Sequence, residues 1–264
     1  MLGLKTHRWN RVFRENGRTL IVAMDHGAIF GVTPGLERPA DVICQVRAGG
    51  ADAILTTYGV ATRFAEEIGG MGTILRIDGG MSRMARESGP LHLVYDVVDA
   101  LRIGADAVGI MGFPGSRFEG DTLPYLAEVV AQATEWSVPV MGEILPAGFE
   151  NPAEWWTDEN SANACRIGAE LGVDFIKTNY SGDVESFRAI VDQVYVPLVV
   201  LGGGKTKEPR DLLEEIWGAM QAGASGVAVG RNIYQYGSPD KMTAAVAAIV
   251  HEDATVDDGL EYLS

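Results

Sequence analysis

Eight apolar, strand-like runs alternate with amphipathic segments along this chain, and the alternation predicts a single-domain α/β fold, the (β/α)8 or TIM barrel. The runs are almost continuously apolar, which is typical of parallel strands covered on both faces. No linker rich in Pro or Ser divides the 264 residues, so residues 1–264 are expected to form one domain. An open, doubly wound sheet is the alternative, but eight evenly spaced units favour closure. The predicted strands are Thr19–Met24, Ala53–Thr57, Thr73–Ile77, Ala107–Ile110, Pro139–Ile144, Phe175–Thr178, Leu198–Leu201 and Gly226–Val229.

Segments with helical periodicity separate these runs. Glycine ends the segment before every second strand, at Gly49-Gly50, Gly104, Gly172 and Gly223. A glycine at the end of a helix tolerates the left-handed conformation that turns the chain back. The clearest helical segments are Asp41–Ala48, Val94–Ile103, Leu123–Glu135, Ser161–Leu171 and Arg210–Gln221.

The two ends of the chain lie outside this series. Residues 1–18 carry Trp9 and Phe13 four positions apart, on one face of a helix, and we expect this N-terminal helix to pack on the bottom of the barrel. The short C-terminal tail, residues 252–264, is expected to hold a helix capped by Thr255 with Asp258.

Composition excludes several classes of function. The formal net charge of −15 argues against a nucleic-acid or acidic-membrane partner, because both need a basic face. No apolar run approaches the roughly 18 residues of a membrane helix, and the first 20 residues lack a signal-peptide core, so we expect a cytoplasmic protein. Cys44 and Cys165 are interpreted as reduced and buried. The four histidines form no ligand spacing, so we expect no metal site.

Lys177 is the most informative residue, because it lies at the end of an apolar strand. Burial disfavours the charged form of an amine, and a neutral lysine is a nucleophile that can form a Schiff base with a carbonyl substrate. The other four lysines fall in predicted loops or helix starts. The alternative is a structural lysine whose ammonium group reaches solvent at the strand end.

Polar side chains gather at the end of the predicted barrel where enzymes of this fold have their active sites. A structural role is plausible for any one of them but not for all. They are Asp25, His26, Asp78, Glu143, Lys177, Tyr180, Lys205 and Arg231, each at or just after the end of a predicted strand.

Two of the carboxylates suit acid–base chemistry. Asp25 could transfer a proton or hold substrate hydroxyls and the lysine; the alternative is a cap for the next helix. Glu143 lies inside an apolar strand, where burial raises the pKa of a carboxyl group and prepares it for proton transfer. A structural salt bridge to Lys177 or Arg76 is equally consistent with the sequence.

Two neighbouring residues have weaker claims. Asp78 could bind substrate or only orient the Gly79-Gly80 turn after it. His26 is more typical of a structural hydrogen bond than of a base.

The loops after the seventh and eighth strands predict a phosphate site. Gly203, Gly204 and Gly230 would let backbone N–H groups approach an oxyanion closely, and Lys205 and Arg231 would add positive charge. Barrels often bind a phosphate at the loops after these two strands. The alternative is a plain tight turn.

Four motifs resemble those of the DeoC/LacD-type class I aldolases. They are Met24-Asp25-His26-Gly27, Ile176-Lys177-Thr178 with Tyr180, Gly202-Gly203-Gly204-Lys205, and Val229-Gly230-Arg231-Asn232-Ile233-Tyr234-Gln235. Within that group the chain is similar to archaeal-type fructose-bisphosphate aldolases, amino-dideoxy-heptulosonate synthases and the autoinducer-2 phosphate thiolase, over nearly its whole length.

This resemblance implies a (β/α)8 barrel with a Schiff-base lysine at Lys177 and an aspartate at Asp25. It also implies a small phosphorylated substrate, bound by the loops of strands seven and eight, and no cofactor beyond the lysine–substrate imine. A homo-oligomer, often decameric, is the expected assembly.

The chain departs from the family pattern in one place. Aldolase members carry a catalytic tyrosine in a Tyr-Pro-Arg-Gly motif after strand five, where this chain has Leu145-Pro146-Ala147-Gly148. Leu145 cannot transfer a proton, so the partner must be another group, with Glu143 or Tyr180 as candidates. The thiolase-like members also lack that tyrosine, and residues 175–235 are most similar to theirs.

The leading hypothesis is a class I aldolase, a lyase that cleaves or forms a C–C bond in a phosphorylated ketose-like substrate through a Lys177 iminium. One alternative is a thiolase that uses the same lysine, a phosphorylated diketone and coenzyme A. Another is a non-catalytic regulator that binds a phosphosugar.

Overall fold

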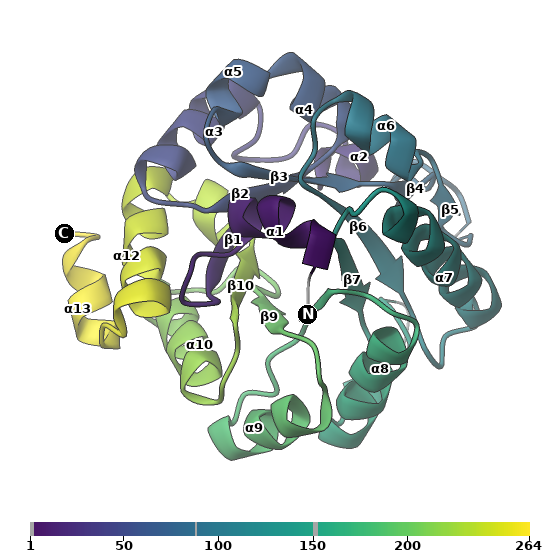
Figure 1. The fold of residues 1–264 in the computed structure, drawn as a ribbon. Helices are drawn as coiled ribbons and strands as arrows, with labels where there is room; N and C mark the ends of the chain where they lie inside the picture. The colour runs from purple at the N-terminus through teal and green to yellow at the C-terminus, as the bar shows by residue number, and fades with distance from the viewer. Residues whose placement is uncertain (1–2, 88, 150–152) are drawn as a thin grey trace.

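The computed structural model describes residues 3–87, 89–149 and 153–264, which form a closed barrel of eight parallel strands (Figure 1). The predicted fold class is confirmed, and every predicted strand is present within one or two residues of its expected bounds. The strands follow one another around the barrel as β1 (Thr19–Ala23), β2 (Ala53–Thr56), β3 (Gly72–Arg76), β6 (Ala107–Gly112), β7 (Val140–Ile144), β8 (Phe175–Thr178), β9 (Leu198–Leu201) and β10 (Gly226–Val229), and β10 pairs with β1.

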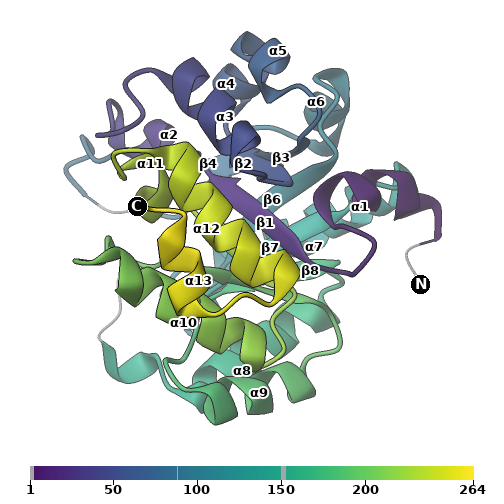
Figure 2. The ribbon, with the colours of Figure 1, turned by 90° about the vertical axis from the view of Figure 1, so that its left-hand side faces the viewer.

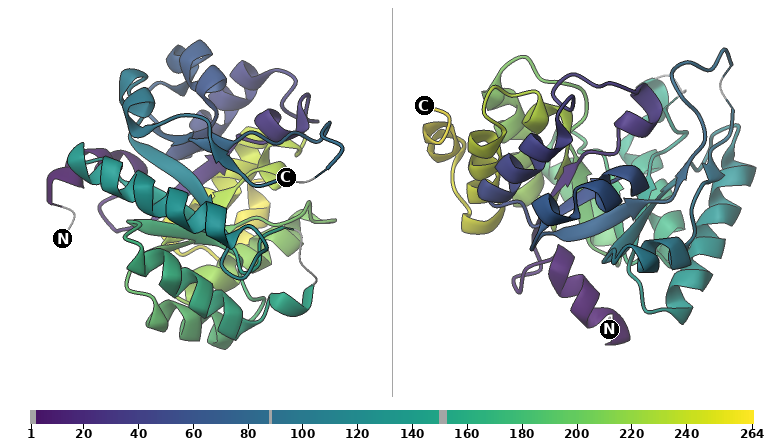
Figure 3. Two further views of the ribbon diagram at one scale, coloured as in Figure 1. Left: turned by 90° about the vertical axis from the view of Figure 1, so that its right-hand side faces the viewer. Right: turned by 90° about the horizontal axis from the view of Figure 1, so that it is seen from above.

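Helices surround the barrel in a ring, which Figures 1 and 3 show from several sides. None of the helices in the described ranges is long and apolar enough to cross a membrane. The helices are α1 (Thr6–Val12), α2 (Gly27–Phe30), α3 (Pro39–Ala48), α4 (Tyr58–Arg63), α5 (Ala65–Ile68), α6 (Val97–Arg102), α7 (Glu119–Glu135), α8 (Asp158–Glu170), α9 (Val184–Gln193), α10 (Pro209–Gln221), α11 (Arg231–Tyr234), α12 (Pro239–Glu252) and α13 (Val256–Glu261), with 3-10 turns η1 (Gly3–Lys5) and η2 (Ala153–Trp155).

Local sequence signals set several element boundaries as expected. Gly50, Gly104, Gly172 and Gly223 have φ angles of 94°, 73°, 96° and 101°, so each turns the chain from a helix toward the next strand through a conformation that favours glycine. Thr255 caps α13, and its side chain and that of Asp258 bond each other's backbone N–H groups, which confirms the predicted cap.

The predicted start of one helix is wrong. The segment Val94–Ile103 is helical only from Val97, because the Asp96 carboxylate accepts a bond from the Asp99 N–H and fixes the start of α6 there. The residues just before it, β5 (His92–Leu93), pair with β4 (Asp78–Gly79) in a small antiparallel hairpin.

The two cysteines also differ from each other. Cys165 is buried, as predicted, but Cys44 is exposed on α3. The inner face of α3 is taken by Val42, Ile43 and Val46, so Cys44 points away from the core.

The bottom of the barrel is closed by an aromatic plug. Trp9 and the residue after α1, Phe13, stack with ring centroids 4.1 Å apart, and both rings meet the edge of Phe175 inside the barrel, at 5.6 and 5.1 Å. Figure 2 shows α1 at the end where β1 begins and α2 and α11 at the other end. The predicted N-terminal helix is therefore present, although it is shorter than residues 1–18.

Along four strands, the inward-facing side chains are apolar near the bottom of the barrel and charged at the top. Alternate residues of a strand face the same side, so the apolar lumen residues are followed two positions later by the next inward side chain. In this way Ala23 leads to Asp25, Ile74 to Arg76, Met141 to Glu143, and Phe175 to Lys177.

Candidate active site

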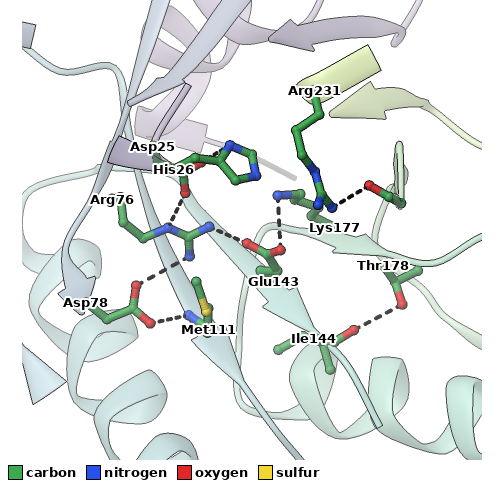
Figure 4. Close-up of polar contacts among 11 residues, drawn as sticks. Asp25, His26, Arg76, Asp78, Met111, Glu143, Ile144, Lys177, Thr178 and Arg231 are labelled. Carbon is green, nitrogen blue, oxygen red and sulfur yellow. Dashed lines mark hydrogen bonds and ion pairs between the residues drawn. The ribbon is translucent and has the colours of Figure 1, made fainter. Parts of the chain in front are cut away.

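Arg76 is the centre of a buried charge network at the top of the barrel (Figure 4). Its Nε donates to Asp25 Oδ2 at 2.9 Å and its Nη1 to Asp78 Oδ1 at 3.3 Å, while Nη2 bonds Glu143 Oε2 in a short contact. Only 5% of Arg76 is exposed, so these carboxylates replace the water that the guanidinium would otherwise bind. Three strand ends are thereby held together by one side chain.

Lys177 joins this network through Glu143. Its Nζ lies 3.0 Å from Glu143 Oε1, so the two oxygens of Glu143 serve Lys177 and Arg76 separately. Glu143 and Lys177 are register partners on β7 and β8, which directs both side chains into the lumen. The salt bridges weighed as alternatives for Glu143 are therefore both present, and they place its carboxylate against the amine.

The charges of the network decide the ionisation of its acids. Burial would raise the pKa of Asp25, but the positive charges of Arg76 and Lys177 outweigh burial and hold that pKa below its ordinary value. Burial also opposes ionisation of Glu143, whose pKa is nevertheless lowered by Lys177 and Arg76. Both acids are therefore carboxylates at neutral pH and can accept protons.

Asp78 behaves differently from these two. Burial raises its pKa, only partly offset by Arg76 and by the bond from the Met111 N–H, which Oδ2 accepts at 2.8 Å. The carboxyl group thus ties the end of β3 to β6. Asp78 thus has a structural role, because its two oxygens bond Arg76 and the backbone of Met111.

His26 lies beside Asp25 at the rim. Its Nδ1 is 3.9 Å from Asp25 Oδ1 and has no hydrogen-bond partner among the described residues. Burial lowers the pKa of His26, so the ring is neutral at neutral pH. The ring packs near Phe30 and Tyr234, with centroids 6.0 and 5.9 Å away.

A cavity of about 340 Å³ opens above Lys177. Lys177, Glu143 and His26 form one part of its wall. The loops after β9 and β10 form another, through Gly202, Gly203, Gly204, Gly230 and Arg231. The structure therefore brings the candidate nucleophile and most of the predicted phosphate residues into one space.

The loop after β9 is shaped by Asn232. The Asn232 side chain donates to the carbonyls of Gly202 and Gly204, at 2.9 and 3.0 Å, and accepts a bond from the Thr206 N–H. In a trans peptide the N–H points opposite to the carbonyl, so the N–H groups of Gly203 and Lys205 point away from Asn232. They are available for an oxyanion on the other side of the loop.

One position in this site, Gly230, requires glycine, and another, Gly203, favours it. Gly203 has φ +54°, in the left-handed region, and a Cβ on Gly230 would lie 2.4 Å from the Ala23 carbonyl oxygen. Arg231 completes the wall, with Nη2 donating to the Gly203 carbonyl at 2.7 Å.

Four of the predicted residues do not line this cavity. Asp25 and Asp78 bond Arg76 instead, and Lys205 and Tyr180 lie elsewhere. Lys205 is exposed and does not line it. The Tyr180 ring packs on Phe187, at 5.4 Å between centroids, and its hydroxyl lies against Gly218 on α10. Because Lys177 faces inward, the alternation of the strand turns Tyr180 outward.

Several residues for which the sequence predicted no site role belong to the site. Arg76, considered only as a salt-bridge partner of Glu143, holds the carboxylates, Asn232 shapes the loop after β9, and Asn179 and Trp156 line the cavity. Arg76 had a detectable signal, since it is a charged residue at the end of an apolar strand, as Lys177 is. Leu145 is fully buried in an apolar cluster with Met111 and Phe113.

No group of three or more His, Cys, Asp or Glu side chains in the described ranges is arranged to hold a metal ion. The nearest approach is the set of carboxylates around Arg76, and there the guanidinium occupies the centre.

Known proteins with similar sequences and structures share this fold over nearly all of their length. The 2-amino-3,7-dideoxy-D-threo-hept-6-ulosonate synthase of Halobacterium salinarum is 38% identical over 254 residues, which cover 95% of this chain and 92% of that protein. The class 1 fructose-bisphosphate aldolase of Thermoproteus tenax is 32% identical over 253 residues, covering 93% and 94%.

Two solved structures extend the comparison to the reaction. A Schiff-base-forming fructose-1,6-bisphosphate aldolase has a TM-score of 0.84 and 32% identity, covering 94% of this chain and 100% of that one. An archaeal fructose-1,6-bisphosphate aldolase, whose catalytic lysine is covalently bound to a carbinolamine intermediate, has a TM-score of 0.85 and 31% identity, covering 93% and 99%. The model of the DeoC/LacD family aldolases matches residues 19–236. The chain therefore belongs to the DeoC/LacD aldolase family, as its motifs indicated, and is a class I, Schiff-base-forming aldolase.

Proposed function

We propose that Lys177 is the Schiff-base nucleophile and that the substrate is a phosphorylated ketose-like compound. The observation that carries this proposal is the position of Lys177, a buried amine at the floor of a cavity whose opposite wall is built from glycine loops and Arg231. A carbonyl group above the amine would thus have an anion-binding wall within reach.

The cleavage reaction then follows from the chemistry of an iminium. The lysine nitrogen adds to the ketone carbon, and loss of water from the carbinolamine gives the iminium. A base removes the proton from the hydroxyl two carbons away, the C–C bond breaks, and its electrons move into the iminium to give an enamine and a free aldehyde. Protonation of the enamine carbon and addition of water release the ketone product and restore the amine.

Glu143 is the proposed proton acceptor for Lys177. The Oε1–Nζ distance of 3.0 Å lies within the reach that proton transfer needs. The positive charge of Lys177 is one of two that keep the pKa of Glu143 low. When the lysine gives up its proton that charge is lost, so Glu143 becomes a stronger base at the moment it is needed.

Asp25 is the proposed base for the substrate hydroxyl. Its Oδ2 is held by Arg76, whereas Oδ1 faces His26 at 3.9 Å. The packing of Tyr180 against Phe187 favours Glu143 and Asp25 over Tyr180 as replacements for the family tyrosine.

Reductive trapping tests the lysine. Borohydride converts an iminium into a stable secondary amine, so the protein is treated with borohydride and dihydroxyacetone phosphate, fructose 1-phosphate or fructose 1,6-bisphosphate. We expect a mass increase of one substrate-derived group, located on the peptide that contains Lys177. Lys177→Met should abolish the adduct and leave less than about 1% of turnover.

Lys205→Met is the matched control, because it removes a lysine from the exposed loop beside the cavity. This variant should form the adduct as the unchanged protein does. An adduct that persists in Lys177→Met, or that maps to another lysine, would show that Lys177 is not the nucleophile.

The need for a cofactor and the oligomeric state can each be tested by a simple measurement. The reaction is proposed to need no cofactor, so dialysis against a chelator should leave turnover unchanged. The protein is proposed to be a homo-oligomer, which light scattering would reveal as a multiple of the 28.3 kDa chain.

A further inference from the structure

Two more cavities, each of about 250 Å³, open on the other side of the charge network. One lies over the ends of β1, β2 and β3, with Asp25, Arg76 and Asp78 in its wall. The other lies over β6 and β7 and is lined mainly by apolar side chains. Those side chains are Ile29, Met81, Leu91, Met111, Phe113, Phe118, Ala147 and Phe149.

These two cavities share part of their walls, and the one over β6 and β7 borders the lysine cavity. Ile29, Met81, Leu91 and Met111 line both of them. Phe149 lines the apolar cavity and also the cavity that contains Lys177. A substrate bonded to Lys177 therefore has two directions in which to extend, one toward Arg231 and one toward this pair of cavities.

The charges in the two directions differ. Toward Arg231 the wall offers a guanidinium and the backbone N–H groups of a glycine loop. In the other direction Arg76 is the one cation among the described lining residues, and Asp25, Asp78 and Glu143 already bond it. A second phosphate placed there would meet carboxylates and apolar surface, and juxtaposed like charges cost several kcal/mol.

The residue at the family's tyrosine position adds to this contrast. Leu145 is buried with Met111 and Phe113, and Leu91 and Leu201 pack on the same cluster. Members of this apolar cluster thus line both cavities, Leu201 the lysine cavity and Leu91, Met111 and Phe113 the cavity over β6 and β7. Ligand sites of this composition bind mainly through apolar contact, with a few polar groups for orientation.

From this asymmetry we infer that the aldehyde half of the substrate is uncharged and largely apolar. It occupies the cavities lined by Met81, Leu91 and Met111, and the ketone half carries the only phosphate. The inference rests on the proposed Schiff-base function and names its acceptor. In the synthetic direction the enamine carbon bonds to the aldehyde carbon and the aldehyde oxygen takes up a proton. Water then hydrolyses the iminium and releases the product.

Competition between apolar, hydroxylated and phosphorylated aldehydes tests the inference. The donor is the phosphorylated ketone that gives the Lys177 adduct, and the acceptors are pentanal, glyceraldehyde and glyceraldehyde 3-phosphate. We expect kcat/KM for pentanal to exceed that for glyceraldehyde 3-phosphate at least ten-fold, which corresponds to about 1.4 kcal/mol. Equal values, or a preference for the phosphorylated aldehyde, would overturn the inference.

A charge added to the cavity should weaken or cancel the preference. Met81→Lys places an ammonium in the wall shared by both cavities and should raise the relative kcat/KM for glyceraldehyde 3-phosphate about ten-fold. Met84→Lys is the matched control, since Met84 lies in the same loop, is 93% exposed and lines neither cavity. If both variants shift the preference equally, or if Met81→Lys does not shift it, the placement of the aldehyde is wrong.

The outcomes also separate this inference from the proposed function. A trapped adduct together with a preference for the charged aldehyde, or with no addition to any uncharged aldehyde, overturns the inference alone. Failure to trap an adduct with any phosphorylated ketone would overturn both.

Discussion

The two ends of the barrel lumen use the same strands for opposite purposes. At the bottom, Phe175 on β8 packs against Trp9 and Phe13 in an apolar plug. Two residues further along the same strand, Lys177 faces a carboxylate that Arg76 also binds. The comparison teaches that the apolar packing at the bottom and the charged groups at the top occupy adjacent layers of inward-facing side chains. Conservative changes at the two ends should therefore have different consequences.

Arg76→Met should have the largest effect on the charged end, because it leaves three carboxylates without their shared cation. Breaking a buried ion pair from one side costs about 3–5 kcal/mol of unfolding free energy. Turnover should also fall by at least a hundred-fold, since Asp25 and Glu143 lose the contact that orients them. Denaturant unfolding and steady-state kinetics measure the two losses. A variant with intact turnover would show that the network is not needed to place the catalytic groups.

Phe13→Ala should weaken the apolar end by a similar amount but spare the chemistry. Truncating a buried phenylalanine costs about 3–5 kcal/mol, and Phe13 is fully enclosed by the plug. At a temperature where the variant remains folded, kcat should stay within two-fold. A loss of kcat comparable to that of Arg76→Met would mean that the two ends are coupled, contrary to the comparison.

Arg231→Ala should distinguish phosphate binding from the other functions of the charged end. Losing a charge-assisted contact to phosphate costs about 1.5–3 kcal/mol, roughly ten- to a hundred-fold in affinity. KM should therefore rise for a phosphorylated ketone and scarcely change for its dephosphorylated analogue. Lys205→Ala, on the exposed part of the neighbouring loop, should leave both values alone. Equal losses for both substrates would assign Arg231 a structural role.

Acidification should lower the free energy of unfolding through the charged end and not through the apolar end. The effect is smaller, about 1.4 kcal/mol for each unit by which a pKa is shifted. The pKa values of Asp25 and Glu143 are lowered in the folded state, mainly by Arg76 and Lys177 against the effect of burial. A carboxylate with a lowered pKa stabilises the fold above its unfolded pKa, near 4. That stabilisation is lost as the pH falls through the folded value.

Unfolding free energies measured between pH 7 and pH 3 should separate the two variants. Phe13→Ala should give a curve parallel to that of the unchanged protein, because the plug does not titrate. Arg76→Met should lose less stability on acidification, because Asp25 and Glu143 lose one of the positive charges that lower their pKa values. Parallel curves for all three proteins would show that Arg76 does not set these ionisations.

The strands, and the position of Lys177 at the end of one, could be predicted from the sequence because both depend on local patterns. Continuous apolar runs identify buried parallel strands, and Lys177 is conspicuous at the end of one. The salt bridge between Arg76 and Glu143 is one of the alternatives that the sequence offers. That Arg76 also bonds Asp25 and Asp78 could not be predicted, since it depends on the order in which β1, β3 and β7 meet around the lumen. Tyr180 is a different case. The alternation of side chains along β8 already indicates that Tyr180 and Lys177 face opposite sides.

The sequence indicated that the loop after β9 is flexible enough to bend closely around a ligand, but not which side chain fixes its conformation. Its glycines suggested a phosphate cradle, whereas its shape depends on Asn232, which follows the next strand. A sequence pattern shows which backbone conformations a loop can adopt. It does not show which distant side chain selects one of them.

The pairing of Thr19 with Gly226 joins the first barrel strand to the last, so the lumen can close only after β10 has been synthesised. Pairings between residues so far apart in sequence form slowly. Arg76, Glu143 and Lys177 all emerge before β10, whereas Asp25 cannot take its final place until β10 has paired with β1. During translation the charge network around Arg76 therefore stays incomplete until β10 has been made, and closure of the barrel is the event that completes it.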